Sequence, residues 1–219
     1  MNYDAIAPYY DWLGALYTGG GIRRAKHRHL RLIEPNVRVL YVGAGTGEEC
    51  LEAARRGADV TVVDLSFPML ERCRARFVRA SQTTPSRLSA QFVLADALRL
   101  EDTGQYDLVV APFFLNVMSS EQLPFALTHL STLLRDTGRL VSVDFSAPSK
   151  SSRVFSVVQR LYYWPPLIMF HFLTNNPWHG LYDYDQVIRQ RHLPLALTER
   201  IPDQAYGLPL LETLVWAKH

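Results

Sequence analysis

The chain has 219 residues, with 23 Lys and Arg against 21 Asp and Glu, so its formal net charge is only +2. This length suits one α/β domain with a sizeable core rather than two domains. A charge this close to balance gives no global signature of nucleic-acid binding. Cys50 and Cys73 have no Cys-x-x-Cys spacing, and the chain opens without a basic and then apolar secretory leader. We therefore expect a reduced, cytoplasmic protein.

The N-terminal segment is rich in aromatic residues and is broken by glycines. Residues 2–18 predict short helical pieces, and three glycines at 19–21 act as a hinge after them. Residues 22–34 have apolar positions at helical spacing, which predicts an amphipathic helix. Five Lys and Arg residues crowd the rest of that helix. A solvated helix face would account for them, and a patch for an anionic surface or substrate is the alternative.

Residues 37–47 read V-R-V-L-Y-V-G-A-G-T-G, an apolar run that ends in glycines at alternate positions. The run predicts a buried strand, the glycines Gly43, Gly45 and Gly47 predict a sharp turn, and residues 48–56 have helical spacing. A strand, a glycine turn and a helix in that order leave backbone amides free beside an open surface. Such a surface suits a nucleotide.

The spacing of the glycines distinguishes two nucleotide classes. The dinucleotide fingerprint is G-x-G-x-x-G/A, and its third small residue would fall on Glu48, which fits poorly. A nicotinamide-dependent oxidoreductase is therefore the weaker interpretation. The pattern G-x-G-x-G is typical of the first motif of S-adenosylmethionine-dependent methyltransferases.

Acidic residues end the next two predicted strands. Residues 58–64 form the second strand and end at Asp64, roughly 20 residues beyond the glycines, where a doubly wound fold places a ribose-binding carboxylate. Residues 90–96 form the third strand and end at Asp96, which can accept the amino hydrogens of adenine. A helix cap at Asp64 and a solvated loop at Asp96 are the alternatives.

The second half of the predicted sheet continues the alternation of strand and helix. Residues 106–110 predict the fourth strand, and the loop 111–117 after it opens beside the nucleotide, where we expect the transfer site. Residues 120–135 predict a helix, Gly138 ends it, and residues 139–145 predict the fifth strand.

These motifs together resemble the class I S-adenosylmethionine-dependent methyltransferases over roughly residues 36–146. The matching pieces are V-L-Y-V-G-A-G-T-G, V-T-V-V-D-L-S, A-D-A, Y-D-L-V-V-A and L-L-R-D-T-G-R-L-V-S-V-D-F. The opening Y-D-A-I-A-P-Y-Y-D is similar to the leader of the ubiquinone/menaquinone C-methyltransferase group. The resemblance implies a single α/β domain over residues 1–219, built on a Rossmann-like, doubly wound, seven-stranded, mostly parallel sheet whose last strand is antiparallel. It also implies an N-terminal helical lid (1–35), a helical substrate-side insert (147–192) and S-adenosylmethionine as methyl donor.

The resemblance also implies which residues bind the cofactor. They are Tyr10, Tyr41, Gly43, Ala44, Gly45, Gly47, Asp64, Leu65, Asp96, Ala97, Ala111 and Pro112. Tyr41 stands where the family usually has an acidic residue, so the contact to the cofactor's amino group is missing or supplied elsewhere. Asp136-Thr137-Gly138 replaces the usual Pro-Gly-Gly and keeps one glycine for the turn.

Residues 147–184 concentrate much of the chain's aromatic content. A helical cover, the wall of a pocket for a flat or greasy acceptor, and an interfacial membrane segment would each explain it. Arg160, Pro165 and Pro166 interrupt the stretch, so we do not expect a transmembrane helix. The expected substrate-side residues are Tyr9, Trp12, Phe113, Asn116, Trp178 and Tyr182. The candidate catalysts are His171, His179 and Tyr163, and no metal-ligand spacing is evident.

The end of the chain predicts a helix over residues 186–192 and strands over 194–202 and 210–217. The predicted activity is methyl transfer from S-adenosylmethionine to a small aromatic, quinone-like or lipid-like acceptor. A cofactor-binding protein without transfer activity and a methyltransferase of a small amine are the alternatives. Ala111-Pro112-Phe113-Phe114 lacks the first Asn or Asp of the base-amine methyltransferases, which argues against a nucleic-acid substrate. Peripheral membrane contact and the oligomeric state stay open.

Overall fold

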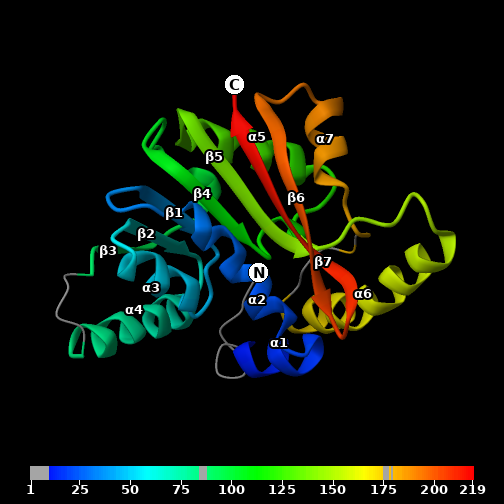
Figure 1. Cartoon of the computed structure of the whole chain (residues 1–219), viewed down its shortest axis with the longest axis horizontal. Helices are drawn as coiled ribbons and strands as arrows, with labels where there is room; N and C mark the ends of the chain where they lie inside the picture. The colour runs from blue at the N-terminus through cyan, green and yellow to red at the C-terminus, as the bar shows by residue number, and fades with distance from the viewer. Residues whose placement is uncertain (1–9, 84–87, 175–177, 179) are drawn as a thin grey trace.

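The computed structural model describes residues 10–83, 88–174, 178 and 180–219. Its strands form a seven-stranded sheet in the order β3-β2-β1-β4-β5-β7-β6 (Figure 1). The first five strands run parallel, and β7 lies antiparallel between β5 and β6. The predicted fold class is confirmed. The strands are β1 (Arg38–Val42), β2 (Asp59–Asp64), β3 (Ala90–Leu94), β4 (Tyr106–Pro112), β5 (Leu134–Phe145), β6 (Leu195–Ala205) and β7 (Leu208–Lys218).

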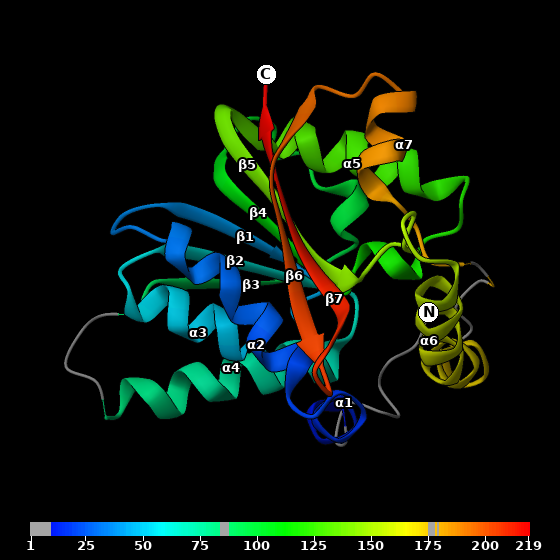
Figure 2. The same ribbon diagram turned by 45° about the vertical axis from the view of Figure 1, so that its right-hand side comes forward.

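Helices cover both faces of the sheet, as Figures 1 and 2 show. One face packs against α2 (Gly21–His27), the 3-10 helix η1 (Arg28–Leu32), α3 (Glu48–Arg55) and α4 (Phe67–Ser81). The other packs against η2 (Ala97–Arg99), η3 (Leu115–Val117), α5 (Gln122–Leu133) and α7 (Tyr184–Gln190). Two more helices, α1 (Tyr10–Thr18) and α6 (Arg153–Thr174), lie beyond one end of the sheet. No helix among the described residues is long and apolar enough to cross a bilayer.

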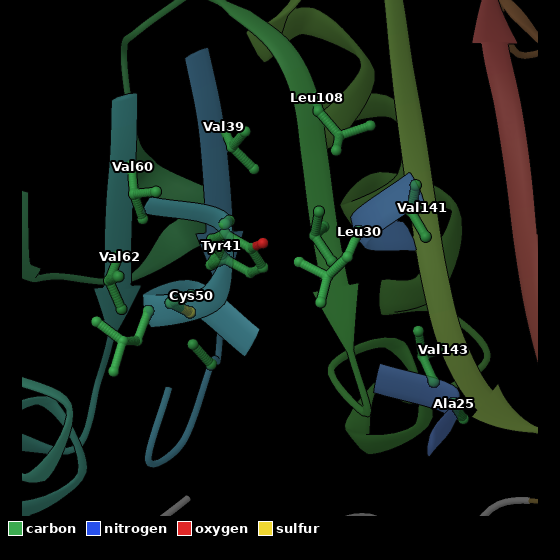
Figure 3. Close-up of a cluster of buried hydrophobic side chains, with 14 of the residues drawn as sticks. Ala25, Leu30, Val39, Tyr41, Cys50, Val60, Val62, Leu108, Val141 and Val143 are labelled. Atoms are coloured by element: carbon green, nitrogen blue, oxygen red, sulfur yellow. The ribbon is translucent and has the colours of Figure 1, made fainter. Parts of the chain in front are cut away.

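Strand β1 shows how the two cores arise. Val39 and Tyr41 belong to one buried cluster, and Leu40 and Val42 to the other. Successive side chains of a strand point to opposite faces, and both faces of this central strand are covered. Figure 3 shows Val39 and Tyr41 among apolar side chains of β2, β4 and β5. The continuous apolar run of the sequence therefore became a strand buried on both sides.

Two predicted helices end at other residues in the structure. The helix predicted over residues 22–34 ends at His27 and continues as the tighter helix η1. The helix before β5 ends at Leu133, and Gly138 lies inside the strand rather than at the helix end. β5 starts early because Leu134 pairs with Tyr106 across a register shift in the ladder with β4. A bulge of this kind lengthens a strand beyond its regular pattern.

The last two strands are longer than predicted. β6 and β7 have eleven residues each and pair antiparallel along most of their length. Pro202 lies within β6, which is the edge strand of the sheet, so its missing N–H interrupts no second ladder. The long hairpin closes the sheet beside β5.

Candidate active site

A cavity of about 1440 Å³ lies at the carboxyl ends of the parallel strands. Its wall includes residues that follow β1, β2, β3 and β4, and Phe145 at the end of β5. Open α/β sheets bind ligands at this edge. Single-ligand pockets are usually about 300–1,000 Å³, so this cavity has room for two small molecules.

The glycine turn forms one side of the cavity. Gly43, Gly45 and Gly47 all have left-handed backbone conformations, with φ of 66°, 60° and 66°, which side-chain-bearing residues rarely adopt. Gly43 and Gly45 line the cavity. Gly47 has a different role, because a Cβ atom there would lie 2.1 Å from Sγ of buried Cys73. Gly47 therefore lets α3 and α4 pack closely.

The two strand-end carboxylates both lie at the cavity wall. Asp64 accepts hydrogen bonds from the backbone N–H groups of Ser66, at 2.8 Å, and Gly45, at 3.4 Å. Burial raises the pKa of Asp64 against these stabilising contacts. Asp96 accepts the N–H of Leu98 at 3.0 Å. The backbone thus holds both carboxylates in place, and further hydroxyl or amino donors would stabilise the charge of Asp64.

A buried ion pair that the sequence patterns did not indicate lies in the same wall. Nζ of Lys26 is 2.9 Å from Oε1 of Glu49, and the two side chains are only 10% and 2% exposed. Both residues line the cavity. Lys26 belongs to the basic run expected to be solvated, and Glu49 is in the first turn of α3, where acidic residues are common. The helical spacing around Ala25 was the one available signal, since it places part of this helix against the core.

Tyr41 does not line the cavity. Its side chain is completely buried, and its hydroxyl lies 2.7 Å from Nε2 of His29. Burial raises the pKa of Tyr41 well above its usual value and lowers that of His29 to about 3, so both groups are neutral. The side chain of Tyr41 lies in the buried core (Figure 3), so a role at the cofactor stays a prediction that the cavity wall does not support.

Aromatic side chains from the loop after β4, the end of β5, α6 and α1 form another part of the cavity wall. Phe113 and Phe145 meet edge to face with ring centroids 5.7 Å apart, and Tyr163 of α6 meets Phe145 at 5.1 Å. Trp12 of α1 is a fourth wall residue. The wall suits a flat or apolar molecule.

One polar atom stands out in that wall. Oδ1 of Asn116 is buried and has no hydrogen-bond partner among the described residues. Asn116 lines the cavity beside Phe113 and Phe114. A buried acceptor without a partner is costly, so a ligand that donates a hydrogen bond here would gain affinity.

Two tyrosines join α1 to α6. The rings of Tyr17 and Tyr162 stack with centroids 4.7 Å apart, and the Tyr162 hydroxyl donates to the Tyr17 carbonyl at 2.9 Å. Burial raises the pKa of Tyr17 to about 12 and also raises that of Tyr162. Both line the cavity and stay protonated at neutral pH, so they are hydrogen-bond donors and not bases.

The structure brings ten of the predicted site residues to the cavity wall. They are Trp12, Gly43, Gly45, Asp64, Leu65, Asp96, Ala97, Phe113, Asn116 and Tyr163. Tyr9 and His179 lie outside the described residues, and Tyr10 is the first residue of α1.

Several other predicted residues lie away from the wall. Ala44, Ala111 and Pro112 are buried in the core around it. The ring of His171 packs on Trp178 with centroids 4.8 Å apart, and neither residue lines the cavity. The Tyr182 hydroxyl donates to the carbonyl of Met118 at 3.0 Å, which holds the ring outside the wall. The roles predicted for these residues stay predictions: side chains of the insert face both toward and away from the cavity, and aromatic content alone does not distinguish the two.

Comparisons with known proteins agree with this geometry. A family model described as a methyltransferase domain matches residues 39–138. The ubiquinone/menaquinone biosynthesis C-methyltransferase of Geotalea uraniireducens is 30% identical over 204 residues, which cover 90% of this chain and 79% of that protein. The chain belongs to the class I S-adenosylmethionine-dependent methyltransferases. The demethylmenaquinone methyltransferase of Deinococcus radiodurans is 33% identical to this methyltransferase over 168 residues, covering 74% of the chain and 65% of the relative.

Solved methyltransferases share the fold at lower identity. Magnesium protoporphyrin IX methyltransferase from Synechocystis, with bound SAH, has a TM-score of 0.65 and 17% identity, covering 91% of this chain and 86% of that one. The 1,6-didemethyltoxoflavin-N1-methyltransferase of Burkholderia thailandensis has a TM-score of 0.65 and 16% identity, covering 98% and 88%. Some curated relatives are longer than this methyltransferase, which spans 62% of the related Geotalea daltonii protein.

Proposed function

We propose that this methyltransferase transfers the methyl group of S-adenosylmethionine to a small aromatic, quinone-like or lipid-like acceptor. The observation that carries the proposal is the division of one cavity. Strand-end carboxylates form one part of its wall, and aromatic side chains form another part with Oδ1 of Asn116, which has no hydrogen-bond partner among the described residues. The relatives named for ubiquinone, menaquinone and demethylmenaquinone methylation support a quinone-like acceptor.

The nucleoside part of the cofactor fits the side of the cavity formed by the glycine turn. Asp64 would accept the ribose hydroxyls, with its carboxylate held by the Ser66 and Gly45 amides. Asp96 would accept the amino hydrogens of adenine beside Ala97 and Leu98. Gly43 and Gly45 carry no side chain, which leaves room for close backbone approach.

The amino-acid part of the cofactor fits the pair of Lys26 and Glu49. Free amino acids carry an ammonium and a carboxylate, and this wall carries the complementary charges at 2.9 Å from each other. Glu49 would thus supply the carboxylate that is absent at Tyr41. In the complex, the cofactor's ammonium would pair with Glu49 and its carboxylate with Lys26. These two ion pairs would replace the Lys26–Glu49 pair, so every buried charge would still have an opposite charge beside it.

The chain's own residues need only position the acceptor. The cofactor supplies an activated methyl group on a sulfonium, so alignment and exclusion of water account for much of the rate. Phe113, Phe145 and Tyr163 would hold an aromatic ring, and Oδ1 of Asn116 would accept a hydrogen bond from a hydroxyl group on it. The high pKa of Tyr17 and the raised pKa of Tyr162 make both unsuited to act as bases.

Two measurements test the function. Isothermal titration should show binding of S-adenosylmethionine, and its absence would refute the proposal. A labelled methyl group should then appear on a naphthoquinol that lacks the ring methyl. Cofactor binding without transfer to this quinol, to phenols or to small amines would favour a cofactor-binding protein that has lost activity. Transfer to the amine alone would favour the second alternative.

The role of the Lys26–Glu49 pair has a sharper test. Glu49→Gln and Lys26→Met should each weaken S-adenosylhomocysteine binding by about tenfold, because each loses one charged hydrogen bond. Neither should change the affinity for methylthioadenosine, which has no amino-acid group. Equal losses for both ligands would mean that the pair only supports the fold of the wall.

A further inference from the structure

Helix α6 exposes an apolar stripe on the outside of the molecule. Its members are Val154, Val157, Leu161, Trp164, Ile168 and Phe172, and they are between 39% and 78% exposed. Their spacings of three and four residues place them along one face of a helix of 22 residues. The helix is thus about 33 Å long, at 1.5 Å per residue.

The opposite face of α6 is already occupied. Tyr163 and Leu167 are buried and line the cavity, and Gln159 is buried against the segment after β5. The helix is therefore apolar on its inner face and apolar on much of its outer face. A helix of this kind is normally covered on all sides.

Charge indicates what covers the stripe. Residues 150–182 contain no Asp or Glu, and Arg153 and Arg160 are exposed, whereas Lys150 pairs with Asp183 at 2.8 Å. Arg153 precedes the stripe, and Arg160 is adjacent to Leu161 within it. A symmetric pairing with α6 of a second copy would bring these arginines together with no carboxylate from either helix. An anionic lipid surface accepts both the apolar side chains and the cations.

Helix α1 adds exposed apolar residues that also line the cavity. Trp12 and Leu16 of α1 are 64% and 60% exposed and also line the cavity. The stack of Tyr17 on Tyr162 holds α1 against α6, and Figures 1 and 2 both place the two helices at the same end of the molecule. Tryptophan is the side chain that favours the boundary between lipid and water.

We propose that the exposed faces of α6 and α1 dock on a lipid bilayer that contains anionic headgroups. Val154 to Phe172 would enter the interface, Arg153 and Arg160 would meet phosphate groups, and the mouth lined by Trp12 and Leu16 would face the lipid. The docking rests on the exposed surface alone. Entry of an apolar acceptor from the bilayer into the cavity rests, in addition, on the proposed function.

Vesicle flotation of the full chain tests the docking. The protein should float with vesicles of phosphatidylcholine and phosphatidylglycerol and bind pure phosphatidylcholine at least about tenfold more weakly. Leu161→Gln/Trp164→Gln should reduce partition into anionic vesicles at least about tenfold. Arg153→Gln/Arg160→Gln should remove most of the preference for anionic lipid.

The matched control is Val78→Gln/Phe125→Gln, which changes two equally exposed apolar residues on α4 and α5. It should float as the wild type does. All variants should keep the thermal transition and the S-adenosylmethionine affinity of the wild type, since none of these residues lines the cavity.

Three results would overturn the docking. One is a wild-type protein that stays at the bottom of the gradient with both vesicle types. Another is equal loss of flotation in the control. The third is a wild-type dimer in sedimentation velocity that Leu161→Gln/Trp164→Gln dissociates, when neither the wild type nor any variant binds vesicles. This result would identify a second copy of the chain as the occupant of the stripe. Cofactor titration on the same samples separates these outcomes from failure of the proposed function.

Discussion

The part of the cavity wall at the ends of β1, β2 and β3 differs in construction from the aromatic part, which comes from the ends of β4 and β5 and from α1 and α6. On the strand side, backbone amides hold each carboxylate, and left-handed glycines set the path of the turn. In the aromatic part, rings from the ends of β4 and β5 and from α6 pack against each other, and Oδ1 of Asn116 in η3 has no hydrogen-bond partner among the described residues. Hydrogen bonds prescribe distance and direction, whereas apolar contacts tolerate a change of shape. The first side suits a ligand common to a whole family, and the second suits an acceptor that differs between relatives.

The largest expected effect concerns the packing of the strand side. Gly47→Ala should lower the free energy of unfolding by about 3 kcal/mol or more, because a left-handed side chain costs about 1–2 kcal/mol and the new Cβ meets Cys73. Gly104→Ala is the matched control, with the same φ of 66° and nothing within 4 Å, and it should cost only about 1 kcal/mol. Denaturant titration measures both. Equal losses would mean that contact with Cys73 does not restrict this turn.

Asp64 should dominate cofactor affinity. Asp64→Ala should weaken S-adenosylmethionine binding by about tenfold or more, since a charged acceptor is worth roughly 1.5–3 kcal/mol. Isothermal titration gives the affinity, and Asp59→Ala at the far end of β2 is the control. An Asp64→Ala protein that binds as the wild type does would contradict the division between the two sides of the cavity.

The buried His29 beneath the glycine turn should make stability depend on pH. Its folded pKa is lowered to about 3, while the unfolded value is about 6.5. Between these values the unfolded chain binds a proton that the native state does not, so stability falls as pH falls. From pH 7 to pH 5 the wild type should lose about 2 kcal/mol more than His29→Gln.

The comparison between variant and wild type is needed for this measurement. Burial raises the pKa of Asp144 to about 7, and this group changes stability with pH in the opposite direction. Its contribution is the same in both proteins and cancels in the difference. Parallel pH profiles for the wild type and His29→Gln would show that His29 is protonated in the folded state.

The smallest effect should come from the aromatic side. Tyr163→Phe should lower kcat for the naphthoquinol by less than about tenfold and leave cofactor affinity unchanged, because general-base catalysis is typically worth 10²–10⁴-fold and positioning needs only the ring. Steady-state kinetics on both proteins measure it. A loss of a hundredfold or more, with a changed pH profile, would make the Tyr163 hydroxyl a catalytic group.

Much of the strand side was predictable because its signals are local. An apolar run, a glycine turn and a helix follow one another within residues 37–56, and Asp64 and Asp96 each end a strand. Parallel strands bring their carboxyl ends to one edge of a sheet, so chain order is enough to predict that these residues meet. The family resemblance supplied the cofactor, and the fold it implies was confirmed.

Other features depend on contacts between distant parts of the chain. In β1, Val39 to Val42 are all buried, so alternation in the sequence could not tell which of the two cores Tyr41 enters. Lys26 and Glu49 carry no pattern that relates them, and only the packing of α2 beside α3 brings them to one wall. On α6 the apolar residues were evident, but not which of them face the cavity. The order of elements along the chain and the nucleotide class follow from local propensity and motif spacing. The direction of each side chain follows from which surfaces the folded chain covers, because burial is a property of the whole assembly of elements.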